Sequence, residues 1–242
     1  MQTKIILCGF DFAGKSVYNE LTNVLIYSIE KYMPDAEWIL NWLEEPELNG
    51  KIKGIVTNTV KLDKWVEELN KCKFGDRVIF LDCDMLLLGS LDGAFDDTFD
   101  VGYTERDESI YPINGGAIYV NVNEKSIKFF NKFKKVNDKM YHDVEFHQVW
   151  RKKYAGMNQA AFGYMLENKS NIAKLKSLPC SKWNVCQNDW CKISDDARLL
   201  HIKGRLRSVL FKSDPIPEDL KKSSDLWLKH KNELNLSEKK YI

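Results

Sequence analysis

Two aspartates at the end of an apolar strand are the feature that most limits how this chain can fold. Residues 78–81 are Val-Ile-Phe-Leu, and Asp82 and Asp84 follow them with one cysteine between. Such a run is typical of a buried strand in a parallel sheet, where an unpartnered carboxylate is strongly unfavourable. Strand alternation would point both carboxylates to one face, about 7 Å apart along the backbone. A hard divalent cation between them would relieve their repulsion, so the run predicts a metal site.

The position of this triplet matters more than its composition. An Asp-x-Asp triplet occurs by chance roughly once or less in a chain of this length, and most such pairs lie in solvated turns. Open α/β sheets, however, bind ligands beyond the carboxyl ends of their strands. Asp82 and Asp84 stand at such an end.

Hydrophobic periodicity predicts alternating strands and helices. The expected strands are 4–8, 37–43, 78–81, 100–103 and 116–122, and the expected helices are 18–32, 62–72, 125–136 and 158–167, with a helical turn at 148–150. Strand, helix and strand follow one another in the N-terminal half. This order predicts βαβ units with right-handed crossovers and a mainly parallel sheet.

Length and composition favour one α/β domain. The chain has 242 residues, of which 44% are hydrophobic and 12% aromatic, enough for one substantial core. We expect this domain to span residues 1–213. Residues 214–242, which include Pro215 and Pro217, form a charged segment expected to be an amphipathic helix that packs on the domain or extends from it.

Charge and hydropathy exclude several classes of protein. Lys plus Arg number 36 against 35 for Asp plus Glu, a formal net charge of +1, which argues against a dedicated nucleic-acid binder. The apolar run at the start is too short for a signal peptide, and no stretch is long enough to span a bilayer. The sequence therefore predicts a soluble, cytoplasmic protein.

The six cysteines are expected to be free thiols, because a chain of this length folds without disulfides. Cys180, Cys186 and Cys191 raise the question of a zinc site. Their spacing matches none of the usual paired-ligand patterns, so zinc is disfavoured.

A second motif predicts different chemistry. Residues Gly9 to Ser16 match the Gly-x4-Gly-Lys-Ser pattern of a phosphate-binding P-loop, between an expected strand and an expected helix. In a nucleotide kinase or NTPase, Lys15 would contact the β- and γ-phosphates and Ser16 a magnesium ion. Asp82 could supply the carboxylate that such enzymes need. This alternative stays open, although it gives the second half of the chain no role.

Four segments of the chain resemble, in the same order, segments of the sugar-nucleotide-dependent glycosyltransferases of the GT-A fold. The resemblance is strongest to the retaining glycogenin-like and galactosyltransferase-like group of glycosyltransferase family 8. The Asp-x-Asp strand, Ile113–Asn121, Gly156–Phe162 and Leu199–Arg207 are similar to its Asp-x-Asp, Asn-Ser/Gly-Gly, Asp-Gln and His-x-x-Gly-x-x-Lys segments. The resemblance covers roughly residues 4–211. It implies a Rossmann-like domain with a mixed, mainly parallel central sheet flanked by helices.

The resemblance implies a metal-dependent transfer of a sugar from a nucleotide-sugar, a UDP-sugar in this group, with retention at the anomeric carbon. Asp82, Asp84 and His201 would hold Mn²⁺ or Mg²⁺, and the imidazole favours Mn²⁺. The ion would stabilise the leaving nucleoside diphosphate. The acceptor, whether saccharide, lipid or protein, and the sugar are not determined by the sequence.

The resemblance also assigns residues to the donor and to catalysis. Those expected at the donor are Asp11, Lys61, Asp82, Asn114, Gly115, Gly116, Gly204 and Arg207. Asn158 and Gln159 are expected at the reacting sugar, where Asn158 stands in place of the group's aspartate and can be neither base nor nucleophile. Arg207 stands where the group usually has lysine, which keeps the charge and changes the geometry. Because of these two departures, an inactive sugar-nucleotide-binding protein stays open as a second alternative function.

Overall fold

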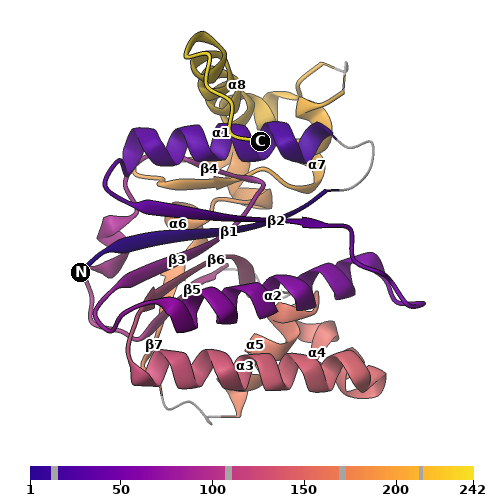
Figure 1. Ribbon diagram of the computed structural model, residues 1–242. Coiled ribbons are helices and arrows are strands. Elements are labelled where there is room, and N and C mark those ends of the chain that lie inside the picture. Colours follow the sequence, from indigo (N-terminus) through magenta and orange to yellow (C-terminus); the bar gives the residue numbers. More distant parts are fainter. Residues whose placement is uncertain (12–15, 107–110, 169–172, 213–214) are drawn as a thin grey trace.

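The computed structural model describes residues 1–11, 16–106, 111–168, 173–212 and 215–242 (Figure 1). A six-stranded sheet forms its centre, in the order β2-β1-β3-β6-β5-β7. The strands are β1 (Thr3–Asp11), β2 (Glu37–Glu44), β3 (Arg77–Asp82), β5 (Val101–Glu105), β6 (Ile113–Asn121) and β7 (Leu175–Pro179). β1 is parallel to β2 and β3, and β5 is parallel to β7, whereas β6 is antiparallel to both of its neighbours. The predicted mixed, mainly parallel sheet is confirmed.

Helices cover both faces of this sheet (Figure 1). α1 (Ser16–Tyr32) lies on one face, and α2 (Lys53–Lys71), α3 (Glu124–His142), α4 (Val144–Tyr154) and α5 (Asn158–Glu167) lie on the other. Alternation along β3 supplies both cores. Phe80 stacks on Trp65 of α2 at 4.8 Å between ring centroids, while Ile79 and Leu81 pack in the core shared with α1.

A small second sheet joins distant parts of the chain. β4 (Met85–Leu87) pairs antiparallel with β8 (Leu199–His201), in a register that sets Met85 opposite His201. β4 follows β3 after a two-residue turn and packs against α1. β8 thus brings His201 to the end of β3. The sequence did not predict either strand, because each is only three residues long.

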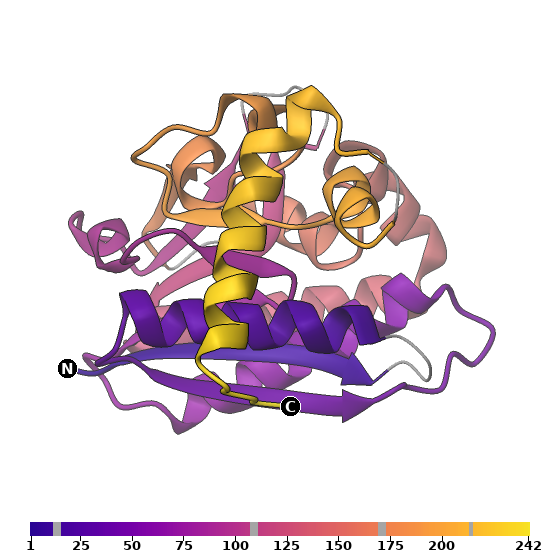
Figure 2. The same ribbon diagram turned by 90° about the horizontal axis from the view of Figure 1, so that it is seen from above.

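The remaining elements lie around this second sheet. They are η1 (Asp92–Phe95), α6 (Cys180–Trp183), η2 (Gln187–Lys192), α7 (Gly204–Leu210), η3 (Glu218–Leu220) and α8 (Lys221–Leu236). α8 crosses over α1 (Figure 2). It buries Trp227 completely and forms an ion pair between Glu233 and Lys31 of α1, with 2.6 Å between the charged atoms. The helix expected after Pro217 is therefore present and docked.

Comparison with the expected elements shows where local pattern was sufficient. α5 has the predicted limits, but α2 begins at Lys53 rather than Leu62. One expectation is wrong: Asp82 and Asp84 do not share an extended strand, because β3 ends at Asp82 and residues 83–84 form a turn. No helix among the described residues is both long and apolar enough to cross a bilayer.

Candidate active site

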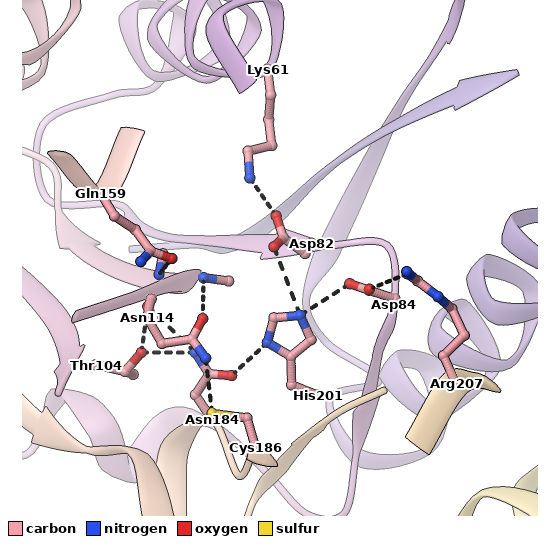
Figure 3. Close-up of polar contacts among 12 residues, drawn as sticks. Lys61, Asp82, Asp84, Thr104, Asn114, Gln159, Asn184, Cys186, His201 and Arg207 are labelled. Carbon is pink, nitrogen blue, oxygen red and sulfur yellow. Dashed lines mark hydrogen bonds and ion pairs between the residues drawn. The ribbon is translucent and has the colours of Figure 1, made fainter. Parts of the chain in front are cut away.

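Two carboxylates and one imidazole meet at the end of β3 (Figure 3). His201 Nε2 lies 3.2 Å from Asp84 Oδ1 and 3.9 Å from Asp82 Oδ2. The backbone fixes this arrangement, because the Ile202 amide donates to the Asp84 carbonyl at 2.7 Å and the β4–β8 pairing sets His201 opposite Met85. The turn after β3 therefore achieves what strand alternation was expected to do. It directs both carboxylates toward one point.

The donor set suits a hard divalent cation. One ligand atom from each of Asp82, Asp84 and His201 lies within 4.8 Å of the others. Among the described residues, no other group of three or more His, Cys, Asp or Glu side chains converges in this way. Carboxylate oxygens with one imidazole nitrogen fit Mn²⁺ or Mg²⁺ and leave positions for oxygen ligands from a substrate.

Each carboxylate also has a cationic partner. Lys61 Nζ, on α2, donates to Asp82 Oδ1 at 2.6 Å, and Arg207 Nη1, on α7, donates to Asp84 Oδ2 at 2.9 Å. Burial alone would raise the pKa of Asp84, but the neighbouring His201 and Arg207 outweigh that effect and hold its pKa below the usual value. Asp84 is therefore ionised at neutral pH, as a metal ligand must be.

Two cavities meet beside these carboxylates. The larger, of about 320 Å³, is lined by Cys8, Gly9, Phe10, Tyr18, Lys53, Gly54, Thr57, Asn58, Lys61, Asp82, Cys83 and Asp84. The smaller, of about 70 Å³, is lined by Asn58, Lys61, Asp82, Gly115, Gly156, Met157, Asn158 and Gln159. Asn58, Lys61 and Asp82 line both. A ligand that extends from one cavity into the other must pass Asp82.

Asn158 and Gln159 differ in how they are held. The Gln159 side chain is fixed by two hydrogen bonds: Oε1 accepts from the Gly115 amide at 3.2 Å, and Nε2 donates to the Tyr154 carbonyl at 2.8 Å. Asn158 is 7% exposed, and neither its Oδ1 nor its Nδ2 has a hydrogen-bond partner among the residues that the structure describes. Buried amides without partners are rare and unfavourable in folded proteins, so this pair of atoms marks a place for a polar ligand.

Asn114, Gly115 and Gly116 belong to β6. The Asn114 amide is already engaged, with Nδ2 donating to Cys186 Sγ at 3.0 Å and Oδ1 accepting from the Gly116 amide at 3.1 Å. Gly115 lines the smaller cavity. Gly116 lies against the His201 ring, where an added Cβ would be 2.5 Å from Cε1. Any side chain larger than the hydrogen atom of glycine at position 116 would therefore clash with the His201 imidazole.

The other expected site residues lie at the ends of elements. Gly204 begins α7 with φ +50°, a left-handed conformation that glycine adopts without strain. Asp11 ends β1, and its side chain lies outside the described part of the chain, as do residues 12–15 of the P-loop-like motif. Gly9 is within β1, where an added Cβ would be 2.3 Å from the Trp42 ring. The first glycine of that motif therefore has a packing role against β2.

Several residues at the site were not found from the sequence. Lys53, Thr57 and Asn58 line the larger cavity because α2 extends further toward its N-terminus than periodicity predicted. Asn184 accepts a hydrogen bond from His201 at 3.1 Å, and no local pattern connects these two residues. The three cysteines considered for zinc belong to no converging group of three or more ligands among the described residues, and Cys191 is exposed whereas Cys180 and Cys186 are buried.

Comparison with known proteins gives matches in fold. No family model and no curated protein matches the sequence. A glycosyltransferase involved in the glycosylation of the major capsid of PBCV-1 superimposes with a TM-score of 0.59 at 12% identity, covering 96% of this chain and 98% of its own. The galactosyltransferase LgtC, solved with donor and acceptor sugar analogues, gives a TM-score of 0.54 at 13% identity, covering 95% of each chain. The chain has the GT-A glycosyltransferase fold.

A third match is larger than this chain. The apo form of the glycosyltransferase GlyE from Streptococcus pneumoniae TIGR4 has a TM-score of 0.56 at 10% identity, covering 99% of this chain and 64% of its own. The GT-A fold implied by the sequence resemblance is thus confirmed. Within it, the candidate metal group lies at the carboxyl end of β3, beyond which open α/β sheets bind ligands.

Proposed function

We propose that this protein is a metal-dependent glycosyltransferase that moves a sugar from a UDP-sugar to an acceptor, with retention at the anomeric carbon. The observation that supports it most is the Asp82, Asp84 and His201 group beside two adjoining cavities in a GT-A fold. The larger cavity is the size of a small-ligand site, and the smaller one, lined by Asn158 and Gln159, would lie against one side of the sugar.

In this proposal Asp82, Asp84 and His201 hold Mn²⁺ or Mg²⁺. When bound, the ion supplies Lewis-acid stabilisation of the departing diphosphate. Arg207 lies 2.9 Å from Asp84 and can turn its guanidinium toward a phosphate oxygen, for which its planar fork of donors is suited. Lys61, 2.6 Å from Asp82, lines both cavities and offers a second cation there.

Asn158 and Gln159 would contact the sugar. The unpartnered amide of Asn158 can both donate to and accept from a hydroxyl group. Gln159 is held against Gly115 and Tyr154, so its side chain would present a fixed surface to the sugar. Neither side chain ionises, so neither acts as a nucleophile. Retention would then proceed by attack on the same face from which the diphosphate leaves.

The test is thermal unfolding with a panel of nucleotides, because a ligand that binds the folded state raises its apparent stability. UDP, UDP-glucose, UDP-galactose, UDP-N-acetylglucosamine, ATP and GTP are compared with and without Mn²⁺, and turnover of each is measured. We expect Mn²⁺-dependent stabilisation by UDP compounds and slow hydrolysis of one UDP-sugar. Stabilisation by ATP or GTP with their hydrolysis would support the P-loop alternative instead. UDP-sugar binding without any transfer or hydrolysis would indicate an inactive binding protein.

A further inference from the structure

His201 is hydrogen-bonded on the side of its ring that faces away from the carboxylates. Nδ1 lies 3.1 Å from Oδ1 of Asn184, while Nε2 points toward Asp82 and Asp84 (Figure 3). His201 is 3% exposed and Asn184 is fully buried, so solvent does not compete for this contact. The partner of Nδ1 therefore decides which nitrogen carries the proton when the other binds an ion.

The orientation of the Asn184 amide follows from counting donors. Thr104 Oγ1 lies 2.8 Å from the Asn114 carbonyl and 2.8 Å from the Asn184 amide nitrogen. A backbone carbonyl only accepts, so the single hydroxyl proton of Thr104 is used there. The Asn184 atom that faces Thr104 must then be a donor, which is Nδ2. Rotating the amide by half a turn would leave two acceptors facing each other, so Oδ1 faces His201.

The backbone holds Asn184 and His201 in this relation. The backbone N–H of Asn184 donates to the Cys180 carbonyl at 3.0 Å, and the backbone N–H of His201 donates to the Val185 carbonyl at 2.9 Å. Gly116 packs against the Cε1 and Nδ1 edge of the ring, where an added Cβ would be 2.5 Å from Cε1 and 2.8 Å from Nδ1. The ring therefore cannot turn over to exchange its two nitrogens without breaking these contacts.

We propose that Asn184 is a positioning residue that keeps a proton on His201 Nδ1, so that Nε2 presents its lone pair to the divalent ion. Thr104 fixes the orientation of the Asn184 side-chain amide and so acts on His201 through Asn184. The proposal rests on the proposed function, because it requires an ion at Asp82 and Asp84. The hydrogen bonds on which it depends are formed by the chain itself, before any ligand binds.

Asn184→Leu tests this role, because it removes the side-chain oxygen that accepts from His201 Nδ1 at nearly constant side-chain volume. Affinity for Mn²⁺ alone is measured from the free-ion signal in electron paramagnetic resonance. Loss of an outer partner of a metal-binding histidine weakens affinity by about 10–100-fold, and we expect this variant to fall in that range. The matched control is Asn137→Leu, since Asn137 is 1% exposed and likewise donates to a threonine hydroxyl, Thr59 Oγ1 at 3.1 Å, between α3 and α2. It should bind Mn²⁺ like the parent.

A second variant separates this role from a structural one. Asn184→Asp loses the donation to Thr104, as leucine does, but keeps an acceptor for His201. It should retain Mn²⁺ affinity within a few-fold of the parent, by the same estimate for outer partners. An equal loss in the aspartate and leucine variants would overturn the proposal.

A measurement on the unaltered protein decides the question even if the Asn184 variants fail to fold. With ¹⁵N-labelled histidine and diamagnetic Zn²⁺ as probe, His201 should show a protonated Nδ1 and a metal-bound Nε2. Binding of the ion through Nδ1 would overturn the proposal. If the parent binds no Mn²⁺ either alone or with UDP present, the metal site of the proposed function fails as well. If it binds Mn²⁺ and Asn184→Leu binds equally well, only the role of Asn184 fails.

Discussion

Gly116→Ala should damage the metal site while leaving the fold in place. Gly116 lies in β6 with an ordinary strand conformation, so alanine strains no backbone angle. Its Cβ, however, would lie 2.5 Å from Cε1 of His201, 2.8 Å from Nδ1 and 2.6 Å from Cε of Met85. Carbon atoms in contact are about 3.5–4.0 Å apart, so something must move by about 1 Å.

The Met85 side chain can move aside at little cost, whereas the His201 imidazole can move only by breaking the contacts that hold it. The Met85 methyl is the free end of a flexible side chain, whereas His201 is held at Nδ1 by Asn184 and through its backbone by Val185. A displacement of about 1 Å exceeds the tolerance of roughly 0.5 Å for a functional constellation. We expect Mn²⁺ affinity to fall at least about tenfold, and the free energy of unfolding to fall by about 1–3 kcal/mol from overpacking.

The assay combines Mn²⁺ titration with denaturant unfolding in the presence of a chelator. Gly102→Ala is the matched control, because Gly102 is buried in the neighbouring strand β5 and its added Cβ would be 3.1 Å from Phe99 and 3.2 Å from Leu178. This control should lose stability without losing Mn²⁺ affinity. The reasoning is refuted if Gly116→Ala binds Mn²⁺ as tightly as Gly102→Ala.

Two further substitutions test other parts of the site. Asp84→Asn should abolish tight Mn²⁺ binding, and calorimetry that finds unchanged affinity would remove Asp84 from the ligand set. The same variant tests the pKa of Asp84. Because that pKa is lowered on folding, the ionised group stabilises the metal-free protein fully above its ordinary value of 3.8 and less as pH falls through the lower folded value. The advantage of the parent over Asp84→Asn in unfolding free energy should therefore shrink only below about pH 4, as acid titrations of both would show. Asn158→Leu should raise the free energy of unfolding by about 1 kcal/mol, because it removes two buried unpartnered atoms, and should abolish sugar turnover. A destabilised variant with normal turnover would contradict that assignment.

Local sequence pattern was enough for the larger elements of the fold. The apolar run before Asp82 predicted β3, and helical spacing gave α5 its limits. The early start of α2 was missed because Gly54 and two threonines in its first turns have low helix propensity, which tertiary packing overrides. The order of the strands was not predicted, since pairings such as β6 between β3 and β5 depend on distant contacts.

The candidate site was predicted to a similar extent. Asp82, Asp84 and His201 were found because their residue types and segments resemble those of a known group, and the structure brings them together. Asn184 was missed because its role depends on a hydrogen bond to residue 201 and on the direction of Thr104. The prediction that Gly116 lies at the donor remains untested, and its contact with the His201 ring was not foreseen. Both depend on side chains that meet only after folding.

The ion pairs of Lys61 and Arg207 have a consequence for the order of binding. Without a metal ion, these cations already balance the two carboxylates at 2.6 Å and 2.9 Å. A divalent ion that arrives alone therefore adds uncompensated positive charge to a partly buried place, whereas a diphosphate supplies the negative charge that restores neutrality. We expect the two ligands to be thermodynamically coupled, each raising the affinity of the other by the same factor. The protein would then bind a metal ion or a nucleotide alone more weakly than it binds the two together, by charge balance alone.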